Sequence, residues 1–99
     1  MDIRIQSIHF DASEQLQKFI QKKATKLEKF CNDIKAIEIQ LKVVKRETSA
    51  NKEAGISLSV PGEDLYASKV CDTFEQAVDD ALIALEKQLH KYKEKQQDK

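Results

Sequence analysis

The residues best suited to chemistry in this chain are lysines that recur at helical spacing. At about 100° per residue, four of them fall within about 80° of one another on the flank of one helix. Like charges at this spacing destabilise a helix slightly. A row of ammonium groups suits the phosphates of a nucleic acid backbone better than base edges. The four are Lys18, Lys22, Lys26 and Lys29.

A second group of lysines occurs near the end of the chain, where Lys87, Lys91 and Lys95 follow in steps of four. The first half of the same segment is acidic, with Glu75 and Asp79. Acid at the start and base at the end is also what a helix dipole favours, so this group is either a binding surface or a solvated helix end. Side-by-side packing of the two helices could merge the two groups into one patch spanning the helix ends.

No arrangement of residues typical of a catalytic or metal site is found. The possible metal ligands and nucleophiles show neither paired spacing nor a Cys–His–carboxylate grouping, and two glycines in all cannot build a glycine-rich phosphate loop. We therefore expect no enzyme activity, cofactor, metal or small-molecule substrate, and free thiols packed as small apolar side chains. The residues considered are Cys31, Cys71, His9 and His90.

Hydrophobic periodicity predicts the elements that position these lysines. Alternating apolar residues indicate strands over 2–9, 37–44, 56–60 and 65–70, and apolar steps of three and four indicate helices over 14–31 and from 72 to about 95. Ser13 is the expected cap of the first helix, and Asp72-x-x-Glu75 resembles a capping box for the second. Residues 45–53 are expected to form a long loop and Pro61-Gly62-Glu63-Asp64 a turn.

The element order is β-α-β-β-β-α, which predicts an α+β two-layer sandwich with both helices on one face of a four-stranded sheet. The helix between the first two strands permits a parallel pair, and the later strands follow as antiparallel hairpins. Polar alternates such as Gln40, Lys42, Ser57 and Ser59 fit a second face left to solvent.

The composition describes one globular domain with a heavily charged surface. The chain has 99 residues, is 40% hydrophobic and 34% charged, and balances 17 basic against 17 acidic side chains. We expect a single domain over 1–95 and a frayed polar tail over 96–99. No apolar run is long enough to span a bilayer and no signal peptide opens the chain, so a cytoplasmic location is expected.

These residues, in this order, resemble the ribosome hibernation promoting factor family, also called ribosome-associated inhibitor proteins. The resemblance covers nearly the whole chain. The most specific piece is Lys26-Leu27-Glu28-Lys29-Phe30, similar to that family's lysine-leucine-glutamate-lysine-aromatic helix end. Similar pieces are Ile3-Arg4-Ile5, Ala67-Ser68, the acidic-start helix 72–82 and the run 85–91.

The resemblance implies a fold like that of double-stranded RNA-binding domains. It also implies binding to the small ribosomal subunit, in the channel used by messenger and transfer RNA, with inhibition of translation. The chain is expected to be monomeric away from the ribosome and to involve no membrane. The resemblance assigns contacts with ribosomal RNA phosphates to Lys22, Lys23, Lys26, Lys29, Lys87 and Lys91, and the same rows extend to Lys18 and Lys95.

The sequence also departs from the family pattern. Glu75 and Ala84 stand where an aromatic and a basic residue are expected, which thins the second half of the patch. The chain stops soon after the second helix, which favours the short, promoting type whose members help ribosomes pair. Two other functions remain open, a general module for structured RNA and a protein-interaction domain. The acidic start of the last helix argues against the first, because it would repel a phosphate groove.

Overall fold

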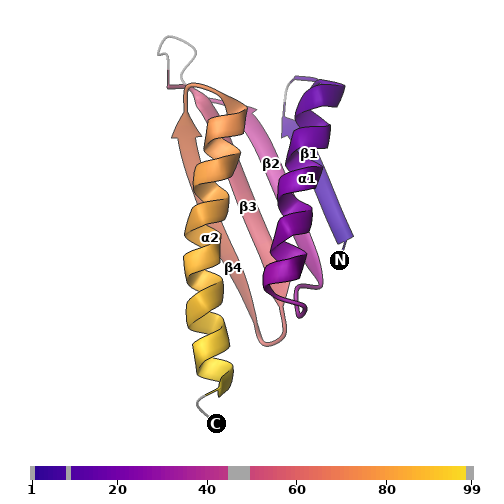
Figure 1. The fold of residues 1–99 in the computed structure, drawn as a ribbon. Coiled ribbons are helices and arrows are strands. Elements are labelled where there is room, and N and C mark those ends of the chain that lie inside the picture. The colour runs from indigo at the N-terminus through magenta and orange to yellow at the C-terminus, as the bar shows by residue number, and fades with distance from the viewer. Residues whose placement is uncertain (1, 9, 45–49, 98–99) are drawn as a thin grey trace.

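The computed structural model describes residues 2–8, 10–44 and 50–97 and confirms the predicted α+β sandwich (Figure 1). The order of the four strands in the sheet is β1-β2-β3-β4, with β1 parallel to β2 and the other neighbours antiparallel. The elements are β1 Asp2–Ile8, α1 Glu14–Phe30, β2 Ala36–Val43, β3 Lys52–Val60, β4 Glu63–Cys71 and α2 Phe74–Gln97. His9 and residues 45–49 of the predicted loop lie outside the described residues.

Both helices lie on one face of the sheet and run in the same direction (Figure 1). The apolar stripe of α1 is buried at Leu16, Ile20, Ala24 and Leu27. The stripe of α2 packs against the same core, with Leu85 and Leu89 fully buried. Alternate residues of the central strands form the sheet side of this core, including Ile37, Ile39, Ile56 and Leu58.

Local signals set the ends of the helices. Ser13 caps α1 as predicted, because its hydroxyl oxygen accepts a hydrogen bond from Leu16 N at 3.1 Å. The predicted cap of α2 at Asp72 is wrong by one residue. Thr73 Oγ1 accepts from Gln76 N at 3.1 Å, so the capping pattern that operates is Thr73-x-x-Gln76. At its far end α2 continues to Gln97, because its last residues are good helix formers with no glycine or proline among them.

The hairpin between β3 and β4 turns through Pro61 and Gly62 alone. Glu63 and Asp64, predicted in the turn, belong to β4, because they pair with Val60 and Ser59. Gly62 has φ 89°, a conformation that glycine adopts without steric cost, as the sequence predicts. The predicted loop ends earlier than expected, because Lys52 and Glu53 pair with β2 as part of β3.

Side chains of α2 tie this helix to the outer part of the sheet. Gln88 Nε2 donates to the Tyr66 carbonyl of the edge strand β4 at 2.8 Å. Tyr92 Oη donates to the Pro61 carbonyl of the β3–β4 turn at 2.9 Å. The helix thus provides hydrogen-bond donors to one backbone carbonyl of β4 and to one of the β3–β4 turn.

We predict that Leu85→Ala lowers the free energy of unfolding by about 2–5 kcal/mol, because Leu85 is 0% exposed and its loss leaves a cavity. Urea unfolding followed by circular dichroism measures this value. Ile83→Ala is the matched control on the same helix, since Ile83 is 52% exposed and should change stability by less than about 0.5 kcal/mol. Equal losses in the two variants would contradict the described packing of α2.

We also predict a pH dependence that originates at Tyr92. Burial raises the pKa of Tyr92 and the Asp33 carboxylate adds to this, whereas an unfolded tyrosine titrates near pH ~10. The contribution of Tyr92 to stability is therefore complete below pH ~10 and is lost as pH rises through the folded pKa. The urea midpoint should fall from neutral to alkaline pH, and it should fall more in the parent protein than in Tyr92→Phe. This variant keeps every other titrating group. An identical fall would show that Tyr92 is not the cause.

Candidate RNA-binding surface

Four lysines of α1 form a row on its solvent side, which we call the α1 ridge. The helix buries Leu16, Ile20 and Leu27 against the sheet, so residues on the opposite side of the helix must face water. All four are exposed, and within the described residues none of them forms a salt bridge. The α1 ridge consists of Lys18, Lys22, Lys26 and Lys29.

Lys23 has a different environment from these four, although it was predicted with them. Its side chain is 31% exposed, and its Nζ lies 3.3 Å from Asp79 Oδ1 of α2. The same Nζ lies 5.5 Å from the centre of the Phe19 ring. Lys23 therefore joins the two helices, and its charge is already partly neutralised.

The predicted lysines of α2 are also exposed and form a second row, the α2 ridge, on the side facing β4. Lys87 lines a hollow of about 310 Å³ with Lys69 of β4. Lys95 lines a smaller hollow beside Pro61 and Gly62 of the β3–β4 turn. The third member of the ridge, Lys91, lies between them in sequence and is exposed.

A groove of about 400 Å³ separates the two ridges along the first half of α2. Lys23 and Lys26 line one wall, and Asp79 and Glu86 line the other. The ridges therefore do not merge along the length of the helices. The acidic start of α2, visible in the sequence, faces α1 at this groove.

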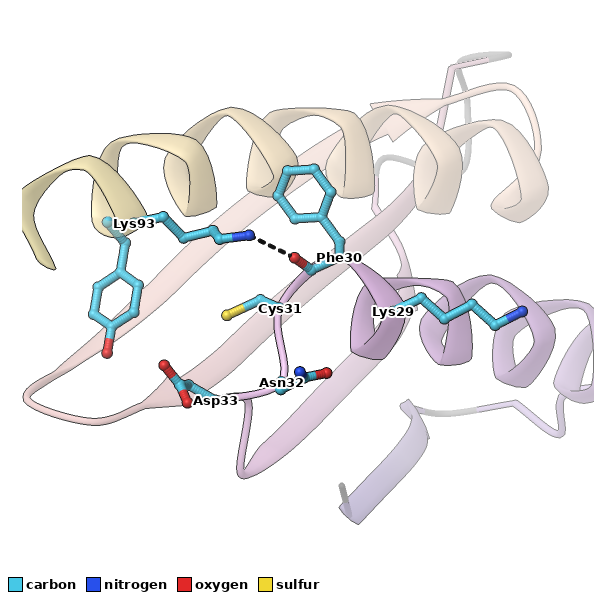
Figure 2. A pocket seen from close by; sticks show the side chains of 7 residues that line it. Lys29, Phe30, Cys31, Asn32, Asp33 and Lys93 are labelled. Carbon is cyan, nitrogen blue, oxygen red and sulfur yellow. Dashed lines mark hydrogen bonds between the residues drawn. The ribbon is translucent and has the colours of Figure 1, made fainter. Parts of the chain in front are cut away.

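A hollow of about 370 Å³ lies at the C-terminal end of α1, beside the later part of α2 (Figure 2). Lys93 Nζ donates to the Phe30 carbonyl at 3.0 Å and lies 5.2 Å from the centre of the Phe30 ring. His90 packs edge-to-face on that ring with 4.9 Å between centroids. Lys29 also lines this hollow, and its side chain extends along α1 away from Lys93 (Figure 2). The Lys93 ammonium thus stabilises the negative end of α1 and adds positive charge between the ridges.

Lys93 was not among the predicted site residues. Its position four residues after the buried Leu89, on the edge of the apolar stripe, was the available signal. Sequence periodicity places Lys93 beside the stripe, but it does not tell which neighbouring element lies there. Only the packing of α2 against α1 brings this ammonium to the Phe30 carbonyl.

The two thiols are not placed for nucleophilic chemistry. Cys31 is 4% exposed and belongs to the core. Cys71 is half-buried, and its pKa is raised by burial and by its hydrogen bond to Asp80, at 3.5 Å from Sγ to Oδ2. Within the described residues no group of three or more His, Cys, Asp or Glu side chains gathers as a possible metal site, and no helix is long and apolar enough to cross a membrane.

Comparison with known proteins identifies relatives along nearly the whole chain. The family model described as "Sigma 54 modulation protein / S30EA ribosomal protein" matches residues 3–97. A ribosome hibernation promoting factor from Pseudomonas putida is 26% identical over 97 residues, covering 98% of this chain and 91% of that protein.

Two solved structures share the fold. A ribosomal subunit interface protein from Coxiella burnetii superposes with a TM-score of 0.83 at 26% identity, covering 94% of this chain and 98% of that one. The N-terminal domain of Protein Y from Thermus thermophilus superposes with a TM-score of 0.77 at 17% identity, covering 93% of this chain and 99% of that one. At that identity the second likeness supports the fold alone.

We predict that Lys93→Met lowers the free energy of unfolding by about 0.5–1.5 kcal/mol, because the carbonyl at the end of α1 loses a charged donor. Lys91→Met is the matched control, since Lys91 is an exposed lysine two residues away that makes no hydrogen bond to α1 in the part of the chain described. Urea unfolding distinguishes the two variants. Equal stability of both would show that the Lys93–Phe30 contact contributes nothing.

Proposed function

Because the chain belongs to the sigma 54 modulation protein / S30EA ribosomal protein family, we propose that it is a ribosome hibernation factor that binds the small ribosomal subunit in the cytoplasm. Bound there, it contacts ribosomal RNA through the α1 and α2 ridges. It occupies the path of messenger and transfer RNA and thereby stops translation. The proposal involves no catalysis.

The observation that carries the proposal is the α1 ridge. Four exposed lysines stand in one row without a salt bridge among the described residues, although like charges at this spacing cost the helix stability. The stability of the fold therefore does not explain this arrangement, whereas binding to a polyanion does. Each ammonium that meets a phosphate releases a condensed counterion, which favours binding at low salt.

The contacts proposed are with the RNA backbone. Lysine is a flexible point charge without the planar fork that arginine offers to bases and phosphates. The wide minor groove of RNA helices is recognised by shape and through phosphates and 2′-hydroxyls. The acidic wall of the groove, with Asp79 and Glu86, opposes a single continuous duplex lying across both helices. This favours a shaped ribosomal site over any free duplex RNA.

The test is co-sedimentation of the purified protein with small subunits, large subunits and whole ribosomes at low and high salt, with translation measured in parallel. Stoichiometric, salt-sensitive binding to the small subunit with loss of translation is expected. The same gradients show whether ribosome dimers form. Absence of binding at low salt would refute the proposal. Equal affinity for free duplex RNA would favour a general RNA-binding module, and salt-independent binding would favour a protein-interaction domain.

We predict that exchanging Lys22, Lys26, Lys29 and Lys91 for glutamate abolishes ribosome binding and leaves the circular dichroism spectrum unchanged, because these side chains are exposed. Lys26→Gln and Lys23→Gln form a matched pair. The first should lower the slope of log K against log salt by about 0.7–1, the value for one phosphate contact. The second should change it less, since Lys23 is paired with Asp79. A folded quadruple variant that still binds ribosomes would exclude the ridges as the binding surface.

A further inference from the structure

The face of the sheet opposite the helices is not covered by any element that the structure describes (Figure 1). Most of its side chains are polar or small, as expected for a face in water. The large exposed apolar side chains on it, among the described residues, are Tyr66 and Val70 of the edge strand β4, 59% and 45% exposed, and of these two only Tyr66 is aromatic. A large aromatic side chain on an open sheet face is a common anchor for a binding partner.

The Tyr66 ring lies along the sheet surface instead of projecting from it. A Cβ built at Gly55 of β3 would stand 2.7 Å from Tyr66 Oη and 3.5 Å from Cζ, so the tip of the ring covers Gly55. Gly55 is buried even though it belongs to the open face, as this cover requires. One side of the ring therefore rests on β3, and the other side is presented to solvent.

Two acidic residues lie on the open face near Gly55, the residue that the ring tip covers. The register places Gln40 of β2 opposite Gly55, with Glu38 two residues along β2 and Glu53 two residues along β3. Glu38 is the diagonal cross-strand neighbour of Gly55, a position from which a long side chain reaches across to the neighbouring strand. Gln40 Nε2 donates to Glu38 Oε1 at 3.2 Å and so orients that carboxylate.

The described residues of the open face carry excess negative charge. Two acids on it are paired, Asp2 with Arg4 at 3.3 Å and Glu53 with Lys42 at 3.6 Å. Glu38 and Asp64 have no cationic partner among the described residues. This face is opposite in charge to the lysine ridges of the helical layer, and it would repel a phosphate backbone.

We propose that this face binds an arginine side chain from a basic protein segment, with the guanidinium stacked on Tyr66 and hydrogen-bonded to the Glu38 carboxylate. Arginine fits both contacts, because its planar group stacks on aromatic rings and forms paired hydrogen bonds with carboxylates. A lysine ammonium could neither stack as a planar group on the ring nor form paired hydrogen bonds with the carboxylate. The site lies on the side of the sheet away from the ridges, so it can be occupied together with RNA and does not depend on the proposed function.

The test is an NMR titration of ¹⁵N-labelled protein at low salt with a short peptide of alternating arginine and glycine. The matching lysine–glycine peptide and oligouridine are titrated separately. The arginine peptide is expected to shift the amide signals of Gly55, Ser57 and Tyr66 and to bind more tightly than the lysine peptide. Tyr66→Leu should weaken binding about threefold to fivefold, the size of one exposed cation–π contact. Tyr66→Phe should retain binding, and Glu38→Gln should weaken it.

Tyr66 is largely exposed, so the Tyr66→Leu variant is expected to fold although leucine is too short to cover Gly55, and its dispersed spectrum verifies this. Ile83→Ala is the control for an exposed apolar side chain on the helical layer and should bind as the parent does. Three outcomes would overturn the proposal: equal affinity for the arginine and lysine peptides, shifts confined to the groove around Asp79 and Glu86, or oligouridine moving the Tyr66 signal in place of the peptide. The last would identify a surface that stacks RNA bases.

Discussion

Burial of one apolar stripe from each helix against the same face of the sheet is the interaction on which the rest of the structure depends. Leu16, Ile20 and Leu27 face the sheet, so the lysines on the opposite side of α1 are exposed to solvent. Because Leu85 and Leu89 occupy the same core, α2 lies beside α1 with its acidic first half at the groove and its later lysines toward β4. The opposite side of the sheet is left uncovered.

The result is a neutral chain with separated charges. The 17 basic and 17 acidic side chains cancel in the total, yet the α1 ridge is basic, one wall of the groove is acidic and the described part of the open sheet face carries more acids than bases. Net charge describes the attraction of a partner to one surface poorly in such a molecule, because exposed charges are screened beyond a Debye length of ~10 Å. A ribosome offers both phosphates and basic protein segments, and this division of charge suits a partner that presents both.

The elements and the fold class were predictable because hydrophobic periodicity is a local property. The stripe of α1 and the alternation in β2 follow from steps of three, four or two residues, and Ser13 caps α1 as expected. The cap of α2 was misplaced by one residue, since Asp72 and Thr73 are both good caps and the backbone decides between them. The start of β3 was missed because polar Lys52 and Glu53 become strand only through pairing with β2.

The sequence by itself determined which lysines face water, because each lies outside its helix's apolar stripe whatever that stripe packs against. It also determined the family, through the order and spacing of short segments. Only the tertiary structure decided which cations are available. Lys23 meets Asp79 and Lys93 meets the Phe30 carbonyl across a helix–helix contact, and the Tyr66 ring covers Gly55 across two strands. These contacts join residues far apart in the chain, and periodicity carries no information about which elements become neighbours.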